Sequence, residues 1–319
     1  MKWKVQCVRS LTLHLVHVTI VGDNVERAMM MQIKPRKSKR GERGLTTDMT
    51  TTSIQIQLPY GFGPDHERVV IGYLAGRLYG RNAWAKAFEA FDLLDQAVLV
   101  TARGRCTFRT LYQQLVDRQM ADAYLGELLA LRDVEQQSPA LWSRFARRIV
   151  SEFTQRGWRR SDAPEARLLL SYLLYWWGAF ARGYAFEVEV FRDLRNSRVQ
   201  FQAHNLLDRQ QRYSPSDLAV SGMAGDVKTS IYFVQAAASL EHDFYIMRLF
   251  AQGRTHMMVV LLKPAAWDII DGDTVPGHLD TIVDQLPAPV RIRRSGQELV
   301  VVDYYEWKRR ILRLQGEIQ

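Results

Sequence analysis

Two aspartates and a lysine lie close together in the C-terminal half of this 319-residue chain. They are Asp217, Asp226 and Lys228. Carboxylate oxygens are the ligands that Mg²⁺ and Mn²⁺ prefer in proteins, and a neighbouring amine can orient a water molecule or stabilise negative charge on a phosphoryl oxygen. These residue types, so close in sequence, indicate metal-dependent hydrolysis of a phosphate ester.

The spacing of the two aspartates predicts that they oppose each other in a hairpin. Their midpoint falls on Ser221-Gly222, a dipeptide typical of turns. A two-residue turn there pairs Val220 with Met223, and therefore Asp217 with Asp226. Directly opposed residues have Cβ atoms roughly 5 Å apart on one face of the sheet. A divalent cation between the two carboxylates would offset their repulsion.

Lys228 follows Asp226 by two positions, so in a strand both side chains point to the same face. The backbone carbonyl of Val227, between them, is a further oxygen ligand. A turn over residues 222–225 is the alternative, and it would separate Asp217 from Asp226 along the hairpin unless a bulge or splayed strands closed the site. An Asp-x-Lys triplet alone usually marks a solvated strand face, and the turn and the second aspartate favour a site.

The same segments resemble the signature of the PD-(D/E)XK nuclease superfamily, which includes restriction endonucleases, Holliday-junction resolvases and transposon end-cleaving nucleases. Pro215-Ser-Asp217 and Asp226-Val-Lys228 match the signature, with one serine inserted between the proline and the aspartate. Upstream, Gly183 precedes Phe186-Glu187, as a glycine precedes a Phe-Glu pair in the family's first helix. The resemblance covers roughly residues 183–262.

The resemblance implies both a fold and an activity. The implied fold is restriction-endonuclease-like, with a helix, a three-stranded meander, a helix and a strand in that order. The implied enzyme is an Mg²⁺- or Mn²⁺-dependent endonuclease that hydrolyses phosphodiester bonds, with DNA as the expected nucleic acid and a homodimer as one implied assembly. Glu187 is the matching helical glutamate, and Glu189 is the less favoured choice. The implied catalytic residues are Glu187, Asp217, Asp226 and Lys228, and the implied cation ligands are Asp217, Asp226, Val227 and Glu187.

The apolar pattern predicts the elements that must position these residues. Its spacing is helical between residues 66 and 182, and a long helix over residues 164–196, with a break near Gly183, leads to a series of short strands. This order predicts an α/β fold, in which a mostly helical N-terminal region precedes a mixed sheet flanked by helices. The helices expected first cover residues 69–79, 83–94, 110–132 and 139–154. The later elements are strands at 199–206, 217–220, 225–231, 244–250 and 257–262, a hairpin at 290–303 and a helix at 304–314.

Three segments are expected along the chain. They are a poorly ordered basic leader (1–57), a helical domain (58–163) and a PD-(D/E)XK nuclease-like domain (164–319). Met49, just before a Thr/Ser-rich stretch, is an alternative start of the protein. In the helical domain, Ser138 is expected to cap a helix whose first turn holds Pro139.

The basic charge balance favours a polyanionic partner, but it does not require one. The formal net charge is +9 and the isoelectric point is near 9.6. Such a surplus suits nucleic acid or an acidic membrane surface, and a merely soluble basic protein is an equally good interpretation. For each arginine considered for phosphate contact, a solvated surface position is the simpler interpretation. The arginines concerned are Arg144, Arg147, Arg148, Arg159 and Arg160.

The two cysteines and the apolar runs favour a cytoplasmic protein without a membrane segment. Cys7 and Cys106 form no CxxC pair and no regular framework, so neither a zinc knuckle nor a disulfide scaffold is expected. The apolar run at residues 168–180 is shorter than the roughly 20 residues that span a bilayer. Residues 11–21 contain two histidines and alternate in polarity, which is typical of a strand rather than a signal peptide.

Two other functions stay open at this stage. One is a catalytically inactive nuclease-fold protein that acts as a nucleic-acid-binding or scaffold module. The other is a helical interaction protein whose C-terminal strands form an ordinary domain. The seven histidines are scattered, and His242 and His256 have no ligand spacing, so no histidine-metal enzyme is expected.

Overall fold

The structure is a computed structural model whose described residues form two compact units. One unit takes its described residues from 122–141 and 179–317, and the other from 55–121 and 142–178. Most of the expected leader and both Arg159 and Arg160 lie outside the described residues. The described residues are 55–74, 81–101, 104–155, 164–212, 214–231, 233–237, 239–262, 273–294 and 296–317.

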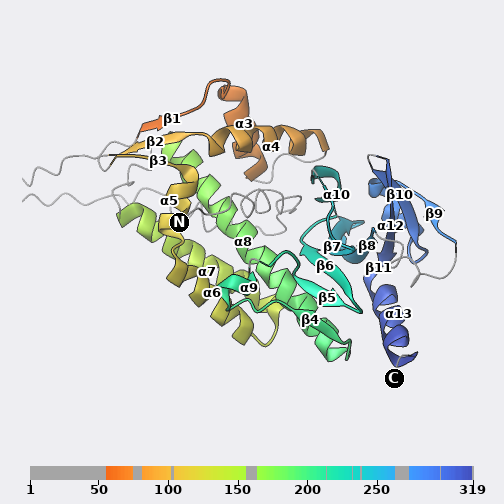
Figure 1. The fold of residues 1–319 in the computed structure, drawn as a ribbon. Helices are drawn as coiled ribbons and strands as arrows, with labels where there is room; N and C mark the ends of the chain where they lie inside the picture. Colours follow the sequence, from red (N-terminus) through yellow and green to blue (C-terminus); the bar gives the residue numbers. More distant parts are fainter. Residues whose placement is uncertain are drawn as a thin grey trace, which may run out of the picture. The chain divides into compact units, whose positions relative to one another are not determined.

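The unit of residues 55–121 and 142–178 combines helices with a small antiparallel sheet (Figure 1). Tyr172 lies in its core, where the hydroxyl donates to Asp95 Oδ1 at 2.7 Å and the ring packs against Phe91 and Phe108. The sheet has the order β1-β2-β3. Its strands are β1 (Gln55–Gln57), β2 (Val98–Thr101) and β3 (Gly104–Thr107), and the helices lying wholly within the unit are α3 (Pro64–Leu74), α4 (Arg81–Asp95) and α5 (Phe108–Leu115).

Three expectations for the helical region were wrong. The small sheet interrupts it, because strands of three or four residues are too short for an apolar pattern to reveal. The helix expected over 110–132 is two helices, α5 and α6 (Arg118–Ala130), since the Asp117 carboxylate accepts the backbone N–H of Met120 and starts a new helix. Helix α7 (Val134–Gln155) begins before Ser138, because Asp133 caps it by accepting the N–H of Gln136.

Helix α8 (Pro164–Asn196) begins and ends where the sequence predicts and contributes residues to both units. The expected break near Gly183 is absent from this helix, which runs on without interruption. A glycine inside a helix costs only about 1 kcal/mol relative to alanine, which the burial of neighbours such as Ala181 and Phe186 outweighs. No helix among the described residues is both long and apolar enough to cross a bilayer.

The unit of residues 122–141 and 179–317 is built on a mixed eight-stranded sheet, so the α/β fold class is confirmed (Figure 1). The pairs β6–β7 and β10–β9 are parallel and the other pairs are antiparallel. In sheet order the strands are β4 (Phe201–Ala203), β5 (Leu218–Val220), β6 (Met223–Lys228), β7 (Phe244–Ala251), β8 (Arg254–Leu261), β11 (Gln297–Asp303), β10 (Val290–Arg294) and β9 (Val275–Pro276).

Both faces of the central strands are buried. Alternate residues of β7 show this, since Phe244 and Ile246 join one apolar cluster while Tyr245 and Met247 join the other. The first cluster also holds side chains from α8 and α13 (Tyr304–Glu317). The second holds side chains from α10 (Phe233–Ala236), η1 (Leu279–Thr281) and α12 (Ile282–Gln285). Strand β7, the parallel neighbour of β6, therefore has apolar side chains packed on both of its faces.

The turn between β5 and β6 is the two-residue turn that the sequence predicts. Ser221 and Gly222 both have positive φ, at 48° and 78°, as the tight hairpin turn that matches strand twist requires. Val220 pairs with Met223, so the alternative turn over residues 222–225 is excluded.

Gly225 in β6 is expected to tolerate no side chain. A Cβ there would lie 2.1 Å from Cζ of Phe244, whose fully buried ring packs against Trp307. We expect Gly225→Ala to lower the free energy of unfolding by about 1–3 kcal/mol, because overpacking forces the ring out of its place. Urea denaturation followed by circular dichroism measures this change.

Gly183→Ala is the matched control, since nothing lies within 4 Å of a Cβ at that position in α8. This substitution should leave stability unchanged or raise it by up to about 1 kcal/mol. Equal urea midpoints for the two variants would contradict the close contact described at Gly225.

Candidate functional site

The candidate site lies beside the first residue of β5, where β6 continues without a paired strand on that side. The β5–β6 ladder stops at Leu218 and Gly225, while residues 226–228 of β6 go on pairing with β7. Asp217 fills the place of the missing strand: its N–H donates to the carbonyl of Gly225 (3.1 Å), and its Oδ2 accepts the N–H of Val227 (2.9 Å). The Asp217 side chain is thus fixed between the two strands, and the ladder does not extend to the expected pair with Asp226.

The carbonyl of Val227 faces the same side as Asp217. Successive residues of a strand direct their peptide groups to opposite neighbouring strands, so residues two apart face the same neighbour. The carbonyl of Ala224 accepts the N–H of Asp243 beside β7, and that of Gly225 accepts from Asp217 on the β5 side. Val227 therefore presents its peptide group to the β5 side, as its bond to Asp217 shows.

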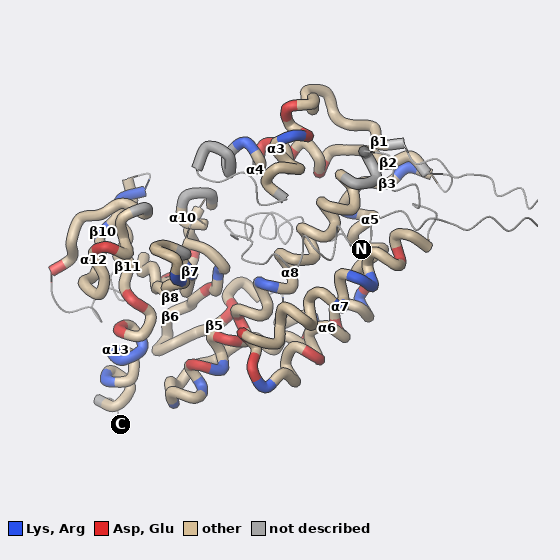
Figure 2. Tube along the Cα trace, turned by 180° about the vertical axis from the view of Figure 1, so that it is seen from behind, with Lys and Arg blue, Asp and Glu red and all other residues tan. Residues whose placement is uncertain are grey.

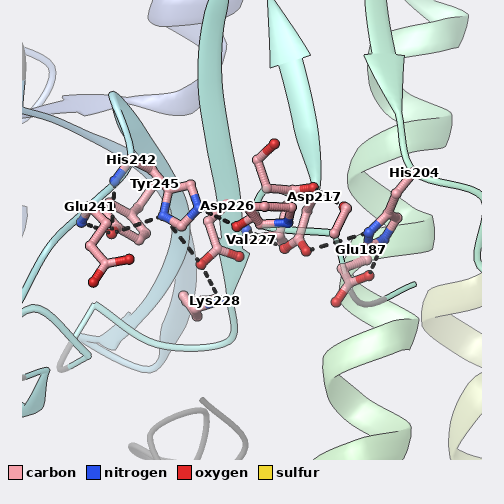
Figure 3. Close-up of polar contacts among 12 residues, drawn as sticks. Glu187, His204, Asp217, Asp226, Val227, Lys228, Glu241, His242 and Tyr245 are labelled. Carbon is pink, nitrogen blue, oxygen red and sulfur yellow. Dashed lines mark hydrogen bonds and ion pairs between the residues drawn. The ribbon is translucent and has the colours of Figure 1, made fainter. Parts of the chain in front are cut away.

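A buried glutamate and a buried histidine approach Asp217 (Figure 3). Glu187 comes from α8, and His204 directly follows β4. His204 Nε2 lies 3.2 Å from Glu187 Oε2, and His204 Nδ1 lies 3.7 Å from Asp217 Oδ1. One ligand atom from each residue falls within 4.8 Å of the others, which is close enough for one shared metal ion. We call these three residues, Glu187, His204 and Asp217, the cation cluster.

Asp226 and Lys228 form an ion pair beside the cation cluster. The Lys228 ammonium contacts Asp226 Oδ2 and lies 5.4 Å above the ring of Phe233. The lysine side chain is only 4% exposed, so this charge is held away from bulk water. A buried ammonium beside buried carboxylates is suited to stabilising an anionic group that enters the site.

His242 ties the loop that carries Asp217 to β7. Its Nε2 lies 2.6 Å from the carbonyl of Pro215 and its Nδ1 lies 3.1 Å from the hydroxyl of Tyr245. A carbonyl only accepts, so Nε2 donates to Pro215. The tyrosine oxygen in turn accepts the backbone N–H of Glu241 at 2.9 Å. The Nδ1 of His242 also lies 3.8 Å from Asp226 Oδ2.

Burial dominates the electrostatics of the site. It raises the pKa of Glu187, and the charge of Asp226 raises this pKa further, against the lowering effects of His204 and Lys228. Burial, followed by the charges of Asp226 and Glu187, holds the pKa of Asp217 well above its usual value. For Lys228, burial alone lowers the pKa, but the carboxylates of Asp226 and Asp217 overcome it and the net pKa is raised. The carboxyl groups therefore hold protons readily, and a bound cation would replace those protons.

The structure brings the four expected catalytic residues together. Glu187 and Asp217 belong to the cation cluster, and Asp226 and Lys228 form the neighbouring ion pair. Glu189, the less favoured glutamate, instead forms an ion pair with Arg248.

The arginines suggested for phosphate contact belong to the other unit or lie outside the described residues. Arg144, Arg147 and Arg148 are exposed on α7, where Figure 2 shows a basic stretch. Nothing in the structure assigns them a ligand, and their contact with nucleic acid stays a prediction. Arg159 and Arg160 are not described.

Sequence reasoning missed His204 and His242. His204 lies 13 residues before Asp217 and 17 after Glu187, and it reaches both only because β4 lies beside β5. His242 contacts Pro215 across 27 residues. No local spacing signals either contact, and only the placement of β4 and β7 in the sheet could have found them.

Comparison of the chain with protein-family models, curated proteins and solved structures gives no match.

The raised pKa values predict how the stability of the metal-free protein depends on pH. A carboxyl group whose native pKa is raised stabilises the native state below its unfolded pKa, and this stabilisation is lost as pH rises through the native pKa. Glu187 and Asp217 behave in this way, so the free energy of unfolding in the presence of a chelator should fall from about pH 5 to about pH 8. Urea denaturation at a series of pH values measures the slope.

Asp217→Asn should flatten this slope, because asparagine keeps an oxygen that accepts the N–H of Val227 but cannot ionise. Glu298→Gln changes a carboxylate on the outer strand pair β10–β11 and should keep the wild-type slope. If the metal-free wild-type protein instead became more stable over this pH range, these carboxyl groups would not determine the pH dependence of its stability.

Proposed function

We propose that this protein is a metal-dependent phosphodiesterase of the PD-(D/E)XK kind, an endonuclease with DNA as its expected substrate. The observation that carries the proposal is the meeting of three carboxylates and an ammonium where β5 and β6 separate. Three of these groups are buried, and the fourth, the Asp217 side chain, is only 16% exposed. Burying like charges is costly, and residues with strongly perturbed pKa values gather at functional sites. The residues are Glu187, Asp217, Asp226 and Lys228.

The order of elements around the site supports a restriction-endonuclease-like core. Helix α8 is followed by the antiparallel meander β4-β5-β6, then by the short helix α10 and by β7 parallel to β6. The resemblance implies the same order of helix, three-stranded meander, helix and strand. One addition is α9 (Arg209–Arg212), a single turn between β4 and β5.

The donor set fits a divalent cation. Asp217 and Glu187 offer carboxylate oxygens, and Asp226 and the carbonyl of Val227 lie beside them on β6. A bound Mg²⁺ or Mn²⁺ ion would polarise the phosphodiester and lower the pKa of water. The protein would contribute a fixed orientation, since Asp217 is held by its bond to the Val227 amide and by the loop contact of His242 with Pro215.

Lys228 is the residue expected to face the phosphate. The carboxylates keep its pKa raised, so its ammonium stays charged at neutral pH. Asp226 aligns that ammonium through their ion pair. The lysine would orient the attacking water or stabilise negative charge on a phosphoryl oxygen as the bond to the leaving oxygen breaks.

A catalytically inactive nuclease fold is the second candidate function. The Asp226–Lys228 pair neutralises both partners, and such a pair also suits a protein that only binds nucleic acid or acts as a scaffold. An assay of nucleic-acid cleavage distinguishes the two functions, because only the active nuclease cuts its substrate.

Lys228→Ala should lower Mg²⁺- or Mn²⁺-dependent cleavage by at least about 100-fold, because it removes the donor aimed at developing charge. The measurement incubates the full chain with single-stranded and duplex DNA and RNA, with either cation or with a chelator, and quantifies the cut products. Lys308→Ala is the matched control: this lysine pairs with Asp193, apart from the candidate site, and its loss should leave cleavage unchanged.

Unchanged cleavage by a folded Lys228→Ala protein would rule out the role given to the lysine. A wild-type protein that binds nucleic acid but cuts none of the substrates would favour the inactive, binding function.

A further inference from the structure

His204 is the residue of the site whose position the proposed nuclease chemistry does not explain. Its side chain is 4% exposed and lies between Glu187 and Asp217. Its Nδ1 is buried, and no described group forms a hydrogen bond with it. A buried polar atom without a partner costs roughly 1–3 kcal/mol, so something outside the described residues must satisfy it.

The contacts of His204 indicate which nitrogen carries the proton. Nε2 lies 3.2 Å from a carboxylate oxygen of Glu187, an acceptor, so the proton belongs on Nε2. In a neutral imidazole with its proton on Nε2, the Nδ1 lone pair would be directed toward Asp217 Oδ1, 3.7 Å away. A cation between these two atoms would give the buried Nδ1 the partner that it lacks among the described residues.

This arrangement is the one that metal-binding histidines adopt. A ligating histidine donates its other ring N–H to a carboxylate, which fixes the tautomer and orients the ring. Glu187 is placed to do this for Nε2. Nitrogen and oxygen ligands lie about 2.0–2.2 Å from a bound transition metal, so a separation of 3.7 Å between Nδ1 and Oδ1 is too long for a hydrogen bond and within the reach of one shared ion.

We propose that His204 Nδ1 and Asp217, with Glu187 orienting the imidazole, bind a divalent transition-metal ion in preference to Mg²⁺. Imidazole nitrogen suits first-row transition-metal ions such as Fe²⁺, Ni²⁺, Cu²⁺ and Zn²⁺, and Mn²⁺ begins the series along which affinity for such sites rises, whereas Mg²⁺ takes oxygen ligands almost exclusively. The inference rests on the proposed function, because it assigns the cation of the same site. The expected cation, Mg²⁺ or Mn²⁺, is thereby narrowed to Mn²⁺ or the divalent ion of a later first-row transition metal.

Metal binding by the full chain, without nucleic acid, tests the inference. Calorimetric titration of the metal-free protein should show Mn²⁺ binding at least about tenfold more tightly than Mg²⁺. The pulsed electron paramagnetic resonance spectrum of bound Mn²⁺ should show coupling to an imidazole nitrogen. His204→Gln should remove that coupling and weaken Mn²⁺ binding by at least about tenfold.

His256→Gln is the matched control. His256 in β8 also has a buried ring nitrogen without a hydrogen-bond partner among the described residues, but it belongs to no metal-ligating group there. Its variant should keep the wild-type affinity and nitrogen coupling. If His204→Gln does not fold, Glu187→Gln provides the second variant, which should weaken Mn²⁺ binding because a neutral amide orients the imidazole less strongly than a carboxylate.

Wild-type protein whose bound Mn²⁺ shows no nitrogen coupling would overturn the inference, and so would a folded His204→Gln variant with wild-type Mn²⁺ affinity. Failure of the proposed function is distinguishable. If the protein binds Mn²⁺ through His204 but cuts no nucleic acid, the proposed nuclease function is wrong and the metal assignment stands. If Mg²⁺-dependent cleavage is unaffected by His204→Gln, the metal assignment is wrong and the nuclease function stands.

Discussion

The bond from the Val227 amide to the Asp217 carboxylate is the interaction on which the candidate site depends. Strand β5 begins directly after Asp217, and beyond its first residue β6 continues without a paired strand on that side. An unpaired amide inside a buried sheet is costly, and the carboxylate satisfies it. The same bond places a negative charge between two strands, where the histidine after β4 and the glutamate of α8 can approach it. The hydrogen bond that satisfies the Val227 amide therefore also assembles the site.

The surrounding core makes this arrangement rigid. Strand β6 contributes Met223 and Val227 to one apolar cluster, and the ring of Phe244 occupies the space that Gly225 leaves empty. His242 fixes the other end of the loop through Pro215, so Asp217 is held from two directions. Rigid elements hold reacting groups more accurately than loops do, which suits chemistry that depends on positioning. The cost is several buried charges, which make the metal-free site a weak point of the fold.

The sequence predicts the parts of this site that local rules control. The spacing of Asp217 and Asp226 predicts the turn at Ser221-Gly222 and the register of β5 with β6, because a two-residue hairpin leaves one choice of pairing. The bounds of α8 follow from its apolar period and its opening proline. Spacing cannot predict that Asp217 turns its carboxylate to a backbone amide, since this depends on where β5 stops. His204 reaches the site through strand order, and the three-stranded sheet of residues 55–107 is too short to leave a pattern.

Charge balance supports the proposed position of the cation, on the histidine side of Asp217. When Glu187, Asp217 and Asp226 are ionised they carry three negative charges, and Lys228 supplies one positive charge. These four groups together leave two negative charges in the site, which one divalent ion would neutralise. Asp226 already has the lysine as its partner, whereas Asp217 faces the lone pair of His204 Nδ1. The proposed cation would therefore lie on the α8 side of Asp217, and the Lys228 ammonium on the other side would be free to face the phosphate of the proposed substrate.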